Sequence, residues 1–269
     1  MRSSAEARVA LAGGCDILDV KEPLHGALGM APPEALQQIA VCLADQAAPP
    51  PWSVALGELA EWPDDRPLPQ LPAGIDFVKV GVAGLSRAGV SERLPGFMRR
   101  LATVLPQGAR SPGWILATYA DFDRAHAASP HGLFEVARQA GCTGLLIDTW
   151  AKQGPGLTGC LDESTLQSLQ THARQLQLPL ALAGRLQLAD IPTLRRVGPE
   201  IVGIRSAACV DGLRTGTLSA SAISRFRAAL AVPASAQALG ADARSGVVSP
   251  GVAVGVTSGA GPVLAPLTT

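Results

Sequence analysis

The chain has 269 residues, with 22 basic and 22 acidic side chains and therefore a formal net charge of zero. No basic stripe indicates a nucleic-acid partner, no polybasic run indicates binding to a membrane surface, and no run of about 18 apolar residues predicts a transmembrane helix. The length is close to the roughly 250 residues of one α/β barrel.

The cysteines and histidines show neither a disulfide pattern nor a metal-binding pattern. No two cysteines form a CxxC pair, and the histidines make no HExxH or similar arrangement. The cysteines are odd in number and stand mostly in apolar stretches, which indicates buried thiols in a reduced, cytoplasmic protein without a structural metal. They are Cys15, Cys42, Cys142, Cys160 and Cys209.

The chain opens with a predicted helix over residues 4–12, after which short apolar runs alternate with amphipathic stretches. Strands are predicted over residues 16–21, 52–58, 77–82, 114–120, 144–149, 179–184 and 201–206. Helices are predicted between and after them, over residues 33–45, 91–105, 130–140, 162–176, 188–197 and 219–230. This alternation is typical of βαβ units with a parallel sheet.

The pattern predicts a (β/α)8 TIM-type barrel of the α/β class, although it contains only seven strands. A helix precedes the first of them, so the first strand of the barrel is apparently missing: either the fold is an incomplete barrel, or this chain begins downstream of its natural start and the strand lies upstream in the natural gene product. Residues 1–230 form the predicted catalytic barrel domain. Residues 231–269 are rich in Ala, Gly, Val and Ser with almost no charge, and they are predicted to be a flexible low-complexity tail without a catalytic role.

Lysine is rare in this sequence. Of the 22 basic residues only three are lysines, and each lies at or just past the carboxyl end of a predicted strand: Lys21, Lys79 and Lys152. Functional residues of α/β barrels gather at that end. An amine loses its proton and attacks a carbonyl, which a guanidinium does not do. The lysines are therefore candidate nucleophiles, with chance placement of surface lysines as the alternative.

Two aspartates accompany the lysines at a spacing typical of strands. Asp19 and Lys21 are two residues apart and therefore share a face of the strand. Asp148 and Lys152 are four residues apart, and they also share a face if the strand continues to residue 152. We expect each carboxylate to lie beside the lysine of its own strand, where it either moves protons or forms a plain ion pair. Amines that converge in a closed site lower one another's pKa and leave a neutral nucleophile near neutral pH.

The loops after the last two predicted strands are candidates for phosphate binding. Barrels often hold a phosphate on such loops, where small residues let backbone N–H groups approach the anion and arginine grips it in a fork. Tight packing turns are the alternative interpretation. The candidate phosphate-binding residues are Gly184, Arg185, Gly203, Arg205, Ser206 and Ala207.

Several short motifs follow one another along the chain: DILDVKEP at 16–23, GALG at 26–29, FVKVG at 77–81, LIDT at 146–149, Lys152, LAG at 182–184 and VGIRSAAC at 202–209. Together and in this order they resemble the motifs of the (5-formylfuran-3-yl)methyl phosphate synthase family, over about residues 5–230. The chain departs from the family pattern in three places. It lacks the strand before the first helix, it has Ser206 where a glycine is expected, and it carries the long tail.

The resemblance implies an enzyme that joins two molecules of glyceraldehyde 3-phosphate through a lysine Schiff base. The reaction releases phosphate and water and forms a phosphorylated furan aldehyde, the furan precursor of methanofuran-type cofactors. By position, Lys21 would form the Schiff base, Asp148 and Lys152 would transfer protons, and Lys79 would tune the site or bind phosphate. Asp19, which shares a face with Lys21, completes the candidate catalytic set. No metal or organic cofactor is implied.

Two other functions are compatible with the sequence. One is a different lysine-dependent aldolase on a sugar phosphate, which would also form a Schiff base but no furan. The other is a non-catalytic barrel that binds a phosphorylated metabolite as a regulator or scaffold. The expected partner of the leading function is a phosphorylated triose, with no nucleic acid or membrane, and self-association into a homo-oligomer is left open.

Overall fold

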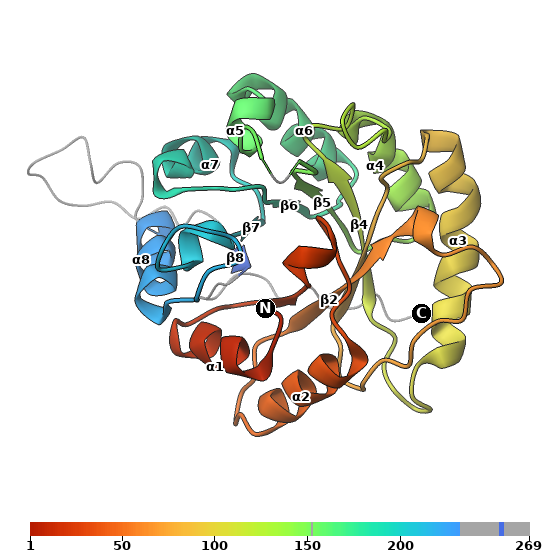
Figure 1. Cartoon of the computed structure of the whole chain (residues 1–269). Helices are drawn as coiled ribbons and strands as arrows, with labels where there is room; N and C mark the ends of the chain where they lie inside the picture. The colour runs from red at the N-terminus through yellow and green to blue at the C-terminus, as the bar shows by residue number, and fades with distance from the viewer. Residues whose placement is uncertain (152, 232–252, 256–269) are drawn as a thin grey trace, which may run out of the picture.

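The computed structural model describes residues 1–151, 153–231 and 253–255, in which eight parallel strands form one sheet in chain order. Figure 1 shows the strands curling around the centre of the molecule. Seven of them coincide with the seven predicted strands, and the α/β barrel class is confirmed. The strands are β1 (Leu18–Val20), β2 (Trp52–Glu58), β3 (Phe77–Gly81), β4 (Gly113–Tyr119), β5 (Gly144–Asp148), β6 (Leu180–Leu182), β7 (Ile201–Gly203) and β8 (Ala253–Gly255).

Helices cover the outer face of the sheet (Figure 1). No described helix is long and apolar enough to cross a membrane. The α-helices are α1 (Ser4–Ala12), α2 (Pro33–Ala44), α3 (Arg87–Val104), α4 (Pro130–Gln139), α5 (Leu157–Cys160), α6 (Glu163–Gln175), α7 (Ile191–Val197) and α8 (Ala220–Ala231). Among the described residues, four short 3-10 helices lie in the loops: η1 (Pro23–His25), η2 (Leu59–Glu61), η3 (Leu188–Asp190) and η4 (Ser206–Ala208).

Side-chain caps explain where several helices begin. Ser3 before α1 and Asp162 before α6 each accept a hydrogen bond from the backbone N–H three residues later. The predicted start of α3 at residue 91 is wrong. The hydroxyl of Ser86 accepts the corresponding bond, at 3.2 Å, so that helix begins at residue 87.

The central strands are buried on both faces, as is typical of a parallel sheet covered by helices. Every residue of β2 and of β5 is buried. Between sheet and helices the core is mostly aliphatic, with Phe97 and Trp114 packed edge to face at 5.6 Å between ring centroids. Charged side chains on these strands, such as Lys79 and Asp148, are buried as well, and burial of a charge is costly unless it is paired.

The cysteines follow the prediction of buried, reduced thiols. All five are free and four of them are buried. Burial raises the pKa of Cys15 and of Cys142 to about 12. These two thiols therefore stay protonated and unreactive at neutral pH.

The eighth strand lies within residues 231–269, where the sequence predicts a tail without structure, so that prediction is wrong for residues 253–255. β8 pairs in parallel with β7, with Ile201 opposite Ala253 and Gly203 opposite Gly255. The sequence has valine at positions 252, 254 and 256 between small residues, a two-residue alternation of β-branched side chains that favours a strand. The rest of the predicted tail beyond residue 231 lies outside the described residues.

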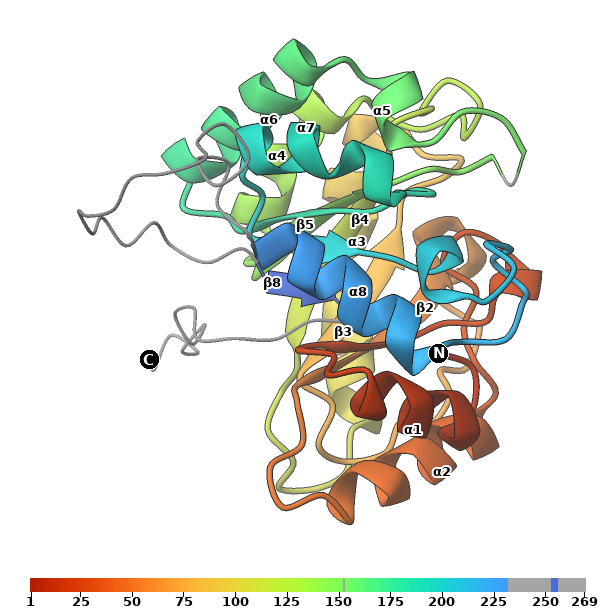
Figure 2. The same ribbon diagram turned by 90° about the vertical axis from the view of Figure 1, so that its left-hand side faces the viewer.

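β1 and β8 are the two ends of the strand order. At the β1 end, the Met1 amine donates to the Asp19 carbonyl, and the Lys21 backbone N–H donates to the Met1 carbonyl at 3.0 Å, so Met1 lies beside β1 like one residue of a parallel neighbour. Outside the sheet, α1 contacts both α2 and α8, and α8 contacts α7 (Figure 2). The contact between α1 and α8 thus bridges the gap between the β1 end and the β8 end of the sheet on its outer side. The strand expected upstream of α1 stays a prediction.

Candidate active site

A cavity of about 130 Å³ lies inside the curled sheet, and its charged lining residues lie on the strands or in the loops that follow them. It also reaches Ile17 and Pro179 near the amino ends, so it extends through the interior of the sheet. Ala207 is not among the residues that line it, and Lys152 lies outside the described residues. The other candidate residues all line it: Asp19, Lys21, Lys79, Asp148, Gly184, Arg185, Gly203, Arg205 and Ser206.

Two lysine–carboxylate pairs occupy the cavity. Lys21 Nζ, just after β1, donates to Asp148 Oδ2 at the end of β5, at 3.0 Å. Lys79 Nζ on β3 donates to Asp19 Oδ1 on β1. The same Asp19 oxygen accepts a hydrogen bond from Ser53 Oγ on β2, at 2.7 Å. Side chains from four strands therefore meet in one polar cluster.

These pairs join different strands, so the prediction that Asp19 pairs with Lys21 along one strand is wrong. Residues two apart share a face, but about 6.6 Å of backbone separates them. The curl of the sheet instead brings β3 and β5, neither of which adjoins β1, across the cavity from the β1 segment. The predicted pair of Asp148 with Lys152 is not placed, because Lys152 lies outside the described residues. The sequence spacing predicts which side chains share a face of a strand, but the tertiary fold determines which carboxylate each lysine contacts.

Burial and neighbouring charge set the protonation balance of the second pair. Burial lowers the pKa of Lys79, the charge of Asp19 opposes this effect, and the Lys21 ammonium lowers the pKa further. Burial alone would raise the pKa of Asp19, but the charges of Lys79 and Lys21 hold that pKa well below its usual range. The Lys21 charge thus lowers the pKa of Lys79, in the predicted direction.

The loop after β5 is held by Asp121, a role that the sequence does not predict. Asp121 Oδ1 accepts a hydrogen bond from the backbone N–H of Trp150 at 2.7 Å, and Oδ2 accepts one from Ala151 at 2.9 Å. Both oxygens of one carboxylate therefore hold the two residues that precede Lys152. Such backbone contacts orient a catalytic loop without taking part in its chemistry.

The loop after β6 brings Gly184 and Arg185 to the cavity. Gly184 has a φ of 110°, and a Cβ there would lie 2.8 Å from Cγ2 of Thr149, so this position requires glycine. Arg185 also has a positive φ, 55°, which is uncommon for a residue with a side chain. Its Nη1 donates to the Gly154 carbonyl at 2.5 Å. Unusual backbone conformations of this kind cluster at ligand sites.

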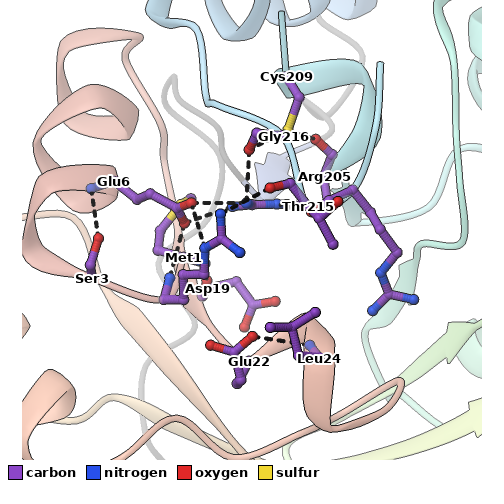
Figure 3. A network of polar contacts seen from close by, with 12 residues as sticks. Met1, Ser3, Glu6, Asp19, Glu22, Leu24, Arg205, Cys209, Thr215 and Gly216 are labelled. Atoms are coloured by element: carbon purple, nitrogen blue, oxygen red, sulfur yellow. Dashed lines mark hydrogen bonds and ion pairs between the residues drawn. The ribbon is translucent and has the colours of Figure 1, made fainter. Parts of the chain in front are cut away.

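Arg205 is engaged by α1, and its contacts do not support the predicted grip on phosphate. Its guanidinium forms a two-pronged ion pair with Glu6, at 2.7 and 2.9 Å (Figure 3). It also donates to the backbone carbonyls of Arg214 and Gly216, at 2.7 and 3.3 Å. Each of its three nitrogens already has a protein partner, so Arg205 ties α1 to the loop after β7.

Replacing Glu6 with glutamine is expected to destabilise the fold, because Arg205 would keep its charge without a carboxylate. Each of these two side chains is only 13% exposed, and breaking a buried pair lowers the free energy of unfolding by about 3 kcal/mol. Chemical denaturation at pH 7 measures the change. Glu163→Gln, which breaks an exposed pair with Arg196, serves as the control and is expected to change stability far less.

The pH dependence of the same variant provides a second readout. Although burial raises the pKa of Glu6, its bonds and attraction to Arg205 bring that pKa down from 4.5 to about 2. A folded-state pKa below the unfolded value stabilises the fold above about pH 4.5, and this stabilisation disappears as the pH falls toward 2. The wild-type protein should show this loss and Glu6→Gln should not. Parallel pH profiles for the two proteins would contradict the assignment.

Arg214 is a charged cavity-lining residue that the sequence analysis missed, and Ser53 is an uncharged polar one. Arg214 lies in the loop after η4, and its Nη2 donates to the backbone carbonyls of Pro23 and Gly26, at 3.4 and 3.2 Å. Burial lowers the pKa of Arg214, and the charge of Asp148 opposes that shift. The sequence feature that could have indicated Arg214 is an arginine with a glycine two residues before it and another two residues after it, shortly after the VGIRSAAC motif.

The fold and the cavity together define an α/β barrel with lysine–carboxylate pairs in its interior, and barrel enzymes place their active sites at the carboxyl ends of the strands. The described residues contain no group of three or more His, Cys, Asp or Glu side chains that could hold a metal ion. The chain belongs to the 4-HFC-P synthase family, which it matches over residues 1–227. Its membership confirms the family that the motifs predict, and this is a family of enzymes.

Curated relatives and a solved structure agree with this assignment. The chain is 33% identical to the (5-formylfuran-3-yl)methyl phosphate synthase of Methanococcus maripaludis, over 78% of this chain and 88% of the relative. It is 32% identical to the synthase of the same name from Methanocaldococcus jannaschii, with the same coverage. A crystal structure of 3-hexulose-6-phosphate synthase superposes with a TM-score of 0.50 at 17% identity, covering 86% of this chain and 96% of that one, which supports the fold alone.

Proposed function

We propose that this protein joins two molecules of glyceraldehyde 3-phosphate into (5-formylfuran-3-yl)methyl phosphate, with loss of phosphate and water, for the synthesis of methanofuran-type cofactors. The names of its curated relatives support this proposal. The observation that carries it is the pair of Lys21 and Asp148 in the cavity, with an amine nitrogen 3.0 Å from a carboxylate oxygen. That pair is what Schiff-base chemistry requires, namely a nucleophile beside a proton acceptor.

Lys21 is the proposed nucleophile. Its side chain is 16% exposed, against 7% for Lys79, so substrate reaches it more readily. The neutral amine attacks the aldehyde carbon, and loss of water leaves a protonated imine. The imine withdraws electrons from the adjacent carbon, which gives up a proton and becomes an enamine. The enamine carbon then attacks the aldehyde carbon of the second molecule.

Asp148 is the proposed acid–base group beside this imine. It accepts a proton from the Lys21 ammonium and later exchanges protons in the eliminations of water and phosphate. Its Oδ1 accepts the backbone N–H of Thr149 at 2.7 Å, which fixes the carboxylate while Oδ2 faces the amine. Lys152, which follows Ala151 in the sequence, is proposed as a second proton-transfer group, and Asp121 accepts the backbone N–H of Ala151.

The remaining cavity residues complete the proposal. Lys79 and Asp19 are the proposed electrostatic partners of the site, because both lie close enough to the Lys21 charge for it to lower their pKa values. The loops after β6 and β7 bind substrate phosphate through backbone N–H groups and the Arg185 side chain. Among their residues, Gly184, Gly203 and Ser206 line the cavity, and Ala207 follows directly.

The test is to incubate the protein with glyceraldehyde 3-phosphate while following furan absorbance and free phosphate, then to reduce with borohydride and map the adduct by peptide mass. An adduct on Lys21, with furan and phosphate in equal amounts, is expected. An adduct without furan would indicate another Schiff-base aldolase. Neither adduct nor product, from a folded sample, would overturn the enzymatic proposal and leave a binding protein.

A further inference from the structure

The charges that line the cavity do not balance. Lys21 and Lys79 each have a carboxylate partner, and the charge of Arg205 is balanced by its ion pair with Glu6 on α1. Arg185 and Arg214 line the same cavity, and within the part of the chain that the structure describes neither forms an ion pair with a carboxylate. Two guanidinium charges, that of the half-buried Arg214 and that of the exposed Arg185, are therefore left over at one site, which favours an anionic ligand.

Arg214 has hydrogen-bonding capacity to spare. Its known bonds are the two from Nη2 to the carbonyls of Pro23 and Gly26, and both are long, at 3.4 and 3.2 Å. Neutral carbonyls do not cancel its charge, and Nε and Nη1 have no partner among the described residues. This contrasts with Arg205, in which every nitrogen is engaged.

We propose that Arg214 binds a substrate phosphate together with the loops after β6 and β7, in the role that the sequence pattern assigns to Arg205. A guanidinium offers two parallel N–H donors that match two phosphate oxygens. Pro23 and Gly26 belong to the loop that follows Lys21, so a phosphate held by Arg214 lies near the nucleophile and leaves the aldehyde end of a short chain within reach of the amine. The inference rests on the proposed function for the identity of the substrate. It makes Arg214 the residue that selects a phosphorylated aldehyde over a neutral one.

Glycerol 3-phosphate tests this inference without any imine chemistry, because it has the phosphate but no carbonyl. Calorimetry on the full chain is expected to show binding that Arg214→Gln weakens at least about tenfold, as loss of a charge-assisted hydrogen bond implies. Arg214→Lys keeps the charge without the fork and should fall between the two. Arg138→Gln, at an exposed arginine in the last turn of α4, is the matched control and should bind like the wild type.

A measurement on the unaltered protein covers the case in which Arg214→Gln does not fold. Phenylglyoxal modifies accessible arginines, and glycerol 3-phosphate is expected to protect Arg214 while Arg138 stays reactive. Affinity within twofold of wild type in folded Arg214→Gln, or no protection of Arg214, would overturn the inference. A Lys21 adduct that fails to form, with this protection intact, would refute the proposed function and leave the phosphate site standing.

Discussion

Replacing Lys21 with arginine is expected to lower the rate of furan formation by at least about a thousandfold, because the reaction loses its covalent nucleophile. Arginine keeps a positive charge beside Asp148 but does not release a proton near neutral pH and forms no imine. The borohydride-trapped adduct should disappear together with furan and phosphate release. Furan absorbance and the intact mass of the reduced protein measure both effects on the same sample.

Two controls separate lost chemistry from lost structure. The melting temperature of Lys21→Arg should stay close to that of the wild type, because the ion pair with Asp148 is kept. Arg138→Lys adds an exposed amine outside the cavity and should gain no adduct at position 138, which shows that trapping is specific. An adduct in Lys21→Arg at wild-type yield would assign the imine to another lysine.

The order of elements was predictable because each one carries a local signal. The central strands are mostly apolar runs, which is typical of strands buried on both faces. β2 matches its predicted bounds because the run begins at a tryptophan and ends at a glutamate. α1 also matches, with Ser3 as a capping residue directly before it. β8 was not predicted, since its alternating valines form only a short signal within a stretch of low complexity, and the pairing with β7 that selects these three residues is not visible in the sequence.

The candidate site was predictable in its residue types and less so in its pairings. Lys21 and Lys79 lie in the cavity because the carboxyl ends of strands converge in any parallel barrel. The ion pair of Arg205 with Glu6 spans 199 positions in the sequence, and no local pattern predicts it. The same holds for Arg214, whose loop reaches the segment after β1 only when the sheet has curled.

Replacing Asp19 with asparagine is expected to have the largest effect on stability in the site. Lys79 would keep a buried amine without its carboxylate, which lowers the free energy of unfolding at pH 7 by about 3 to 5 kcal/mol. The loss should shrink as the pH rises. In the variant, the pKa of Lys79 falls further below its ordinary value of about 10.4, so between those values the unfolded chain binds more protons than the folded protein and stability increases with pH.

Ser53→Ala separates the charge of Asp19 from its hydrogen bonding. Ser53 Oγ donates to the same carboxylate oxygen at 2.7 Å, and its removal should cost about 1 kcal/mol without a new dependence on pH. Urea titrations of the wild type and both variants at pH 7 and pH 9.5 measure the difference. If the stability of Asp19→Asn is as independent of pH as that of Ser53→Ala, then Lys79 does not depend on Asp19 for its charge, and the pair does not tune the amines of the cavity.

If Asp19→Asn regains stability at high pH, the same neutral Lys79 is available to lower the barrier for a proton transfer. The pH profile of furan formation by Asp19→Asn should then shift toward lower pH.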